Sequence, residues 1–189
     1  VNDPINDPHI IKYDKAHLVL IGIVKRELRY TEMNYEHLVE FSKSFNSMPI
    51  KRRFAKIENF KSFTGFYNAV SKESALTTKR QLEGYVVQDA EVNMVKIKLP
   101  FYNFWKCMRG FIKQKKNAEI KDKKFDIANI VNNHFLINEA DKPAAIKFLE
   151  YIKTIPADQR EKDIISLRDE FLRKNEIKIE SKPKIKLKQ

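Results

Sequence analysis

The spacing of apolar residues changes at Pro100, and this change constrains the fold more than any other feature of the chain. Before Pro100, residues 85–87 and 94–98 form two short β-prone runs separated by the polar stretch 88–93, which is typical of an antiparallel hairpin. After it, apolar residues recur at helical spacing: Phe101, Phe104, Trp105, Met108 and Ile112. We therefore expect an α+β fold in which a hairpin leads directly into helices.

Three charged residues mark this predicted hairpin. Lys96 and Lys98 are two positions apart on one strand, so their side chains project from the same face. Two neighbouring ammonium groups repel each other unless an anion lies between them, and a phosphate would meet that need. Glu83, when ionised, only accepts hydrogen bonds and can hold a hydrated divalent ion. The alternatives are a solvated strand face for the lysines and an ordinary turn acid for Glu83.

The order of these motifs resembles motifs IV and V of the covalent nucleotidyltransferases. Residues 83–87 give an acid-Gly-aromatic-Val strand, and residues 95–102 give a Lys-x-Lys strand followed by Tyr102. The pattern is most similar to that of RNA ligases of the phage type 1 branch. The resemblance covers roughly residues 1–112 and implies a partial, ATP-grasp-like antiparallel sheet domain of the nucleotidyltransferase type. The helical spacing of apolar residues after it predicts a small all-α C-terminal domain.

That resemblance also implies a reaction and its cofactors. The expected function is an ATP-dependent RNA ligase that seals 5′-phosphate and 3′-hydroxyl RNA ends, as in RNA repair, through lysyl-AMP and RNA-adenylate intermediates. ATP, bound as AMP, and Mg²⁺ or Mn²⁺ are the implied cofactors, and RNA is the implied partner.

The resemblance further assigns a role to each matching residue. Lys96 and Lys98 would contact the AMP phosphate, Glu83 would contact the metal or the nucleotide, Val86 would pack on the adenine face, and Tyr102 would take part in catalysis. Ordinary core packing is the alternative for Val86 and for Tyr102, which lies in a strongly apolar stretch.

The family's nucleophile does not occur in this sequence. These ligases attack ATP with a lysine in a Lys-x-Asp-Gly motif, whereas the four glycines here follow Ile21, Thr64, Glu83 and Arg109. We therefore expect the C-terminal part of a ligase that is inactive alone and whose missing N-terminal part carries the nucleophile. The alternatives are an inert basic RNA-binding module and a DNA ligase or capping-type enzyme. The last two are disfavoured because the residues after 112 read as helices rather than an OB barrel.

Composition agrees with a nucleic-acid partner and argues against several other classes. A formal net charge of +12 attracts polyanions. The single cysteine, Cys107, excludes an intramolecular disulfide and a Cys-rich zinc site and favours the cytoplasm. No apolar run is long enough for a membrane span. The four histidines show no ligand spacing: His9, His17, His37 and His134.

Further elements follow from periodicity and turn residues. We expect a hairpin of residues 9–13 and 17–25, a strand at 50–57, and helices at 34–46, at 60–70 with an interruption at Gly65, and at 122–137, 142–154 and 159–174. The predicted domains are residues 1–112, the helical residues 113–176 and a basic tail, 177–189. The tail is an edge strand or, since Pro183 interrupts pairing, a basic arm. Lys51, Arg52, Arg53 and Lys56 would line RNA or form a solvated surface.

Overall fold

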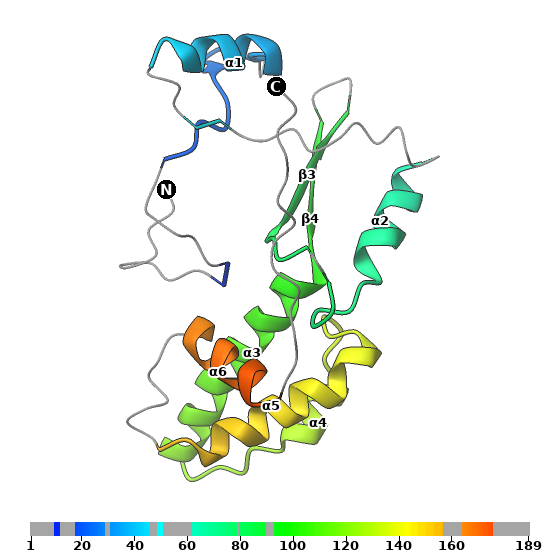
Figure 1. Ribbon diagram of the computed structural model, residues 1–189, viewed down its shortest axis with the longest axis vertical. Helices are drawn as coiled ribbons and strands as arrows, with labels where there is room; N and C mark the ends of the chain where they lie inside the picture. Colours follow the sequence, from blue (N-terminus) through cyan, green and yellow to red (C-terminus); the bar gives the residue numbers. More distant parts are fainter. Residues whose placement is uncertain are drawn as a thin grey trace.

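The computed structural model describes residues 10–11, 18–28, 31–45, 49–50, 62–78, 80–89, 93–156 and 164–175 (Figure 1). These residues form a mixed α+β structure with two antiparallel two-stranded sheets and with helices throughout the C-terminal half, which confirms the predicted fold class. The elements are β1 (Val24–Lys25), β2 (Thr31–Glu32), α1 (Tyr35–Lys43), α2 (Phe63–Ser71), β3 (Gly84–Gln88), β4 (Met94–Lys98), α3 (Pro100–Ile120), α4 (Ile127–Asn132), the 3₁₀ turn η2 (Glu139–Asp141), α5 (Lys142–Thr154) and α6 (Ile164–Lys174).

The expected hairpin is present as β3 and β4, which pair antiparallel over their whole lengths. Residues directly opposite each other in such a ladder point to the same face. Val86 lies opposite Lys96 and Gly84 opposite Lys98, so one face carries the two lysines. Tyr85 lies opposite Ile97 on the other face.

Helix α2 covers the face that carries Ile97. Val70 of α2 is buried with Ile97, and Phe66 packs its ring edge-on against Tyr85 at 5.7 Å between ring centroids. The hydroxyl of Ser62 caps α2 by accepting a hydrogen bond from the backbone N–H of Gly65, which lies in the first turn. The helix therefore continues through this glycine without the predicted interruption.

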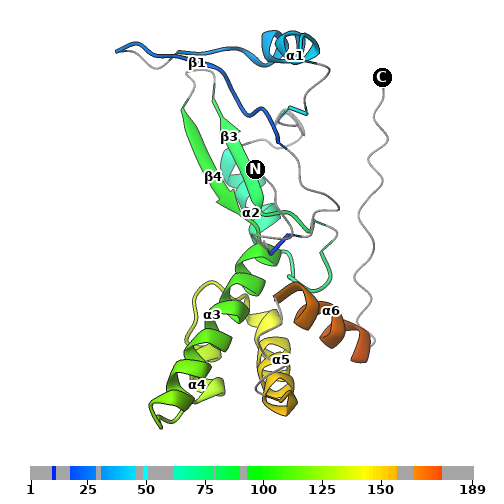
Figure 2. The same ribbon diagram turned by 90° about the vertical axis from the view of Figure 1, so that its left-hand side faces the viewer.

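Helix α3 continues directly from the end of β4 and leads away from the hairpin in both views (Figures 1 and 2). Leu99 is the extended N-cap residue and Pro100 occupies the first turn, where its missing N–H costs no hydrogen bond. The apolar stripe ends at Ile112, yet the helix runs to Ile120 because residues 113–120 are mostly strong helix formers. The predicted boundary between residues 112 and 113 therefore falls within one continuous helix, and the division into domains remains a prediction.

Helices α3, α5 and α6 share the largest core in the described part of the chain. The ring of Phe148 on α5 lies edge-on against Trp105 of α3 at 5.3 Å and against Phe171 of α6 at 5.1 Å between centroids. All three side chains are almost fully buried. The helix predicted at 142–154 is confirmed as α5, and α6 occupies the described part of 159–174.

The prediction of a helix over residues 122–137 is wrong in its extent. Of these residues, only 127–132 are helical. The carboxylate of Asp126 accepts a hydrogen bond from the N–H of Asn129 and so begins α4 late. Asn132 and Asn133 then end it early, because asparagine favours caps and turns over helix interiors.

The N-terminal segment also differs from expectation. Ile10 and Ile11 form a bend and are buried in the helical core, and Arg168 of α6 donates a hydrogen bond to the carbonyl of Ile10 at 3.0 Å. Val24 and Lys25 pair with β2 instead of with residues 9–13. The proposed hairpin is therefore not formed by the residues described, because its two isoleucines are buried among helices.

Several predictions fall partly or wholly outside the described residues. The predicted helix at 34–46 is confirmed as α1, which begins after the cap residue Asn34 and ends at Lys43. Of the strand predicted at 50–57, only Ile50 is described, in a bridge to Leu20. The basic cluster at 51–56 and the tail at 177–189 lie outside the described residues.

Candidate functional site

The hairpin brings the three predicted charged residues together. Glu83 lies just before β3, and its carbonyl accepts a hydrogen bond from the N–H of Leu99 at 3.1 Å. Its carboxylate forms an ion pair with the ammonium of Lys98, and the ammonium of Lys96 lies 3.7 Å from the same oxygen. The side chain of Lys96 is 63% exposed and that of Lys98 is 30% exposed.

This arrangement changes one step of the sequence argument. The side-by-side lysines predicted an anion between them, and a phosphate was the expected one. In the structure the carboxylate of Glu83 supplies that negative charge. The carboxylate offsets one of the two positive charges within the chain, so the spacing of the lysines alone does not require a phosphate.

Tyr102 adjoins these charges from the first turn of α3. The ammonium of Lys98 lies 4.4 Å from the centroid of its ring and that of Lys106 lies 5.9 Å from it, so both cations face the aromatic ring. The ring also packs against the helical core and is half-buried. Tyr102 is thus both a packing residue and a neighbour of the charged cluster, and its catalytic role remains a prediction.

Burial and a neighbouring cation both act on the ammonium of Lys98. Burial lowers the pKa of Lys98, and the positive charge of Lys106 lowers it further. Lys106 was missed by the sequence analysis. The feature that could have identified it is its position four residues after Tyr102, which places both side chains on one face of a helix.

Val86 lies on the same face as the lysines, directly opposite Lys96. Its side chain is 62% exposed, so the alternative that it is an ordinary core residue is wrong. It offers an apolar surface beside a cation, but its contact with adenine remains a prediction.

Gly84 is required by a close approach of the two strands. A Cβ atom built at this position would lie 3.1 Å from the Cα atom of Lys98 and closer still to the carbonyl of Ile97. Backbone atoms cannot move aside as a flexible side chain can. A glycine here therefore lets Glu83 and Lys98 come together across the hairpin.

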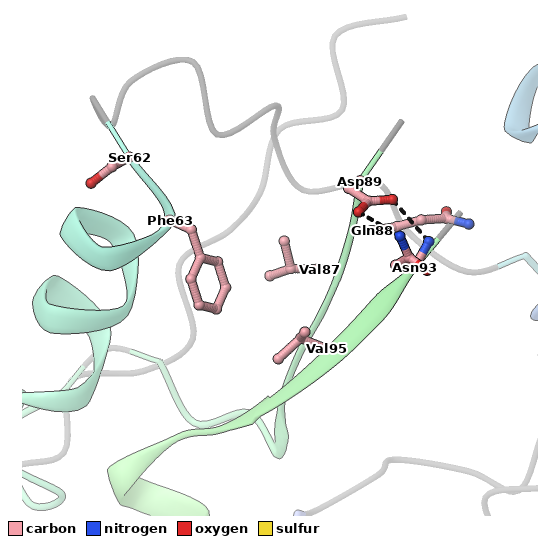
Figure 3. Close-up of a pocket in the computed structure, with 7 residues that line it drawn as sticks. All are labelled: Ser62, Phe63, Val87, Gln88, Asp89, Asn93 and Val95. Atoms are coloured by element: carbon pink, nitrogen blue, oxygen red, sulfur yellow. Dashed lines mark hydrogen bonds between the residues drawn. The ribbon is translucent and has the colours of Figure 1, made fainter. Parts of the chain in front are cut away.

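A pocket of about 500 Å³ opens on the opposite face of the hairpin (Figure 3). The ring of Phe63 points toward Val87 and Val95, and the carboxylate of Asp89 accepts hydrogen bonds from the backbone and amide nitrogens of Asn93 at 2.8 and 3.0 Å. None of the predicted site residues lines this pocket.

The remaining candidates belong to the helical core or lack ligand geometry. Trp105 is buried, and burial raises the pKa of the Cys107 thiol to about 11, so the thiol stays protonated at neutral pH. Its sulfur lies 3.7 Å from Nδ1 of His134. Among the described residues, no group of three or more His, Cys, Asp or Glu side chains could hold a metal. No helix there has both the length and the apolar character needed to cross a membrane.

Comparison with known proteins gives a match to a protein family. The family model described as RNA ligase, of the T4 RNA ligase 1 type, matches residues 1–102 of the 189. The matched range includes Glu83, Lys96, Lys98 and Tyr102. Neither the curated proteins nor the solved structures gave a match.

Proposed function

We propose, because this chain belongs to the RNA ligase family, that it contacts the reacting phosphates during ATP-dependent joining of 5′-phosphate and 3′-hydroxyl RNA ends, as in RNA repair. The joining would pass through lysyl-AMP and RNA-adenylate. The observation that carries the proposal is the convergence of Glu83, Lys96 and Lys98 on one face of the hairpin, beside Tyr102.

The lysines would stabilise the charge that develops during each transfer. Negative charge builds on the phosphate oxygens, and cations held in place before the reaction lower the barrier without reorganising. Lys96 is the more exposed of the two and is our candidate for the α-phosphate. Lys98, held by Glu83 and by the ring of Tyr102, would contact the phosphate from a more fixed position.

Glu83 would hold the divalent ion or orient the nucleotide. A single carboxylate suits Mg²⁺, which keeps several waters and is commonly bound by one or two carboxylates together with substrate phosphates. When bound, such an ion neutralises charge on the phosphates. A phosphate that binds both lysines would release Glu83 for this role, and Val86 would support the adenine.

The nucleophilic lysine has to come from elsewhere in this proposal. None of the four glycines follows an aspartate, so the Lys-x-Asp-Gly motif would belong to a segment outside these 189 residues. In this proposal Lys96 and Lys98 would bind phosphate and would not attack it in line, as a covalent nucleophile must.

The test mixes this chain with a separately expressed segment that carries Lys-x-Asp-Gly, together with labelled ATP, Mg²⁺ and a 5′-phosphorylated RNA. We expect AMP on the partner segment and joined RNA. Lys96→Ala and Lys98→Ala should each reduce labelling or joining at least about 100-fold, near 3 kcal/mol. Lys43→Ala, an exposed lysine on α1, is the control. Wild-type rates in both variants would overturn the site assignment.

A catalytically inert RNA-binding module is the second candidate. It is favoured by the carboxylate of Glu83, which already lies beside both ammonium groups and offsets one of their two positive charges. RNA binding without any AMP adduct in the mixture would support this candidate over a ligase. AMP found by mass spectrometry on a lysine of the isolated chain would contradict both.

A further inference from the structure

A row of cations follows one face of α3 outward from the candidate site. We call Lys106, Arg109, Lys113 and Lys116 the basic stripe. Their spacing of three, four and three residues keeps them on the same side of a helix as Tyr102. All four side chains are exposed, whereas Phe104, Met108 and Phe111 face the core.

The basic stripe carries no acid of α3 between Lys106 and Lys116. The only acid in the helix is Glu119, which lies three residues after Lys116 and pairs with the buried Lys115. Four like charges on consecutive turns are unfavourable for an isolated helix. Such an arrangement suits a surface that binds a polyanion.

The basic stripe continues the positive charge of Lys96 and Lys98 on the hairpin. The ammonium groups of Lys98 and Lys106 both face the ring of Tyr102, and the charge of Lys106 is close enough to Lys98 to lower its pKa. Because α3 leads straight on from β4 (Figure 2), the row of cations begins at Lys96 and Lys98. From Lys106 to Lys116 it extends for about 15 Å at 1.5 Å per residue.

We infer that the basic stripe of α3 binds the backbone phosphates of an RNA strand whose reacting end lies at Lys96 and Lys98. This inference rests on the proposed function for the identity of the polyanion. Contacts to phosphate fix the position of a strand without reading its sequence, so the basic stripe would act on RNA of any sequence.

The test compares two variants with the same change of charge. The stripe variant carries Arg109→Gln, Lys113→Gln and Lys116→Gln, and leaves Lys106 in place because its charge acts on Lys98. The control variant carries Lys147→Gln, Lys153→Gln and Arg173→Gln, which are exposed on α5 and α6. Binding of a 5′-phosphorylated, twelve-nucleotide single-stranded RNA is measured by fluorescence anisotropy over a salt series, without ATP.

We expect the slope of log affinity against log salt to fall by about 2 in the stripe variant, at roughly 0.7 per lost phosphate contact. The control variant should keep a slope close to wild type. A 5′-phosphorylated dinucleotide, which reaches the lysines but not the stripe, should bind both variants equally. Circular dichroism verifies the fold, and Lys113→Gln alone should lower the slope by about 0.7 if the triple variant unfolds.

Equal slopes in the stripe and control variants would overturn the inference, because binding would then depend on total charge alone. The assay involves no catalysis, so its outcome is independent of the joining assay. Failure of joining with a stripe-dependent slope would reject only the ligase proposal.

Discussion

The helical unit, α3 to α6, and the β3–β4 hairpin are held together in different ways. The helical unit buries a continuous aromatic and aliphatic core around Trp105 and Phe148. The hairpin buries little more than Ile97, and Val70 and Leu99 beside it, while its other face carries charges and the exposed Val86. Stability is therefore concentrated in the helices, and the candidate chemistry lies on the less well packed strands.

The largest expected effect is loss of core packing in the helical unit. Phe148→Ala should lower the free energy of unfolding by about 3–5 kcal/mol, because the buried ring contacts the rings of both Trp105 and Phe171. Urea denaturation followed by circular dichroism measures it. Phe135→Ala is the control, since its side chain is 89% exposed. Similar losses in the two variants would show that burial in the helical core is not what stabilises this unit.

A smaller effect should follow from crowding in the hairpin. Gly84→Ala would place a Cβ against the backbone of β4, and overpacking of this kind costs about 1–3 kcal/mol. The hairpin should shift, and Glu83 should lose its contact with Lys98. Gly110→Ala is the matched control, because nothing lies within 4 Å of its Cβ position and alanine stabilises a helix interior by about 0.5–1 kcal/mol. A stable Gly84→Ala protein would show that the strands can separate at no cost.

The smallest effect concerns Cys107, which reports opening of the helical unit. Burial raises the pKa of its thiol from 9.0 to about 11, so the folded state disfavours the thiolate. The protonated thiol therefore makes its full contribution to the free energy of unfolding below pH 9. That contribution is lost as the pH rises toward 11. Labelling by a disulfide reagent at pH 8 should be slow in the native protein and fast in urea. Fast labelling of the native protein would indicate that the region around α3 opens readily.

Sequence periodicity predicted the hairpin and the start of α3 because both depend on local patterns. Within residues 94–98, Val95 and Ile97 alternate with Lys96 and Lys98. Pro100 then marks the change to helical spacing of apolar residues. The extent of α4 was overestimated because apolar spacing continued past Asp126 and Asn132, whose capping preferences limit the helix. The capping preferences of Asp126 and Asn132 thus determined the ends of α4 more strongly than the spacing of apolar residues did.

The residues predicted to form a site lie near one another, but the sequence did not predict which of them pair. That Lys96 and Lys98 share a face follows from a period of two. The position of the Glu83 carboxylate beside both ammonium groups depends on the register of β3 against β4. That register cannot be read from either strand alone. The burial of Ile10 among helices likewise depends on contacts with distant residues.

The hydrogen bond from Arg168 to the carbonyl of Ile10 joins positions separated by 158 residues. During synthesis Ile10 leaves the ribosome long before α6 is made. At about 5–20 residues per second, roughly 8–32 s pass before its partner exists. The helical core therefore closes only after α6 has been made, and until then two apolar side chains that belong inside it are open to chaperones.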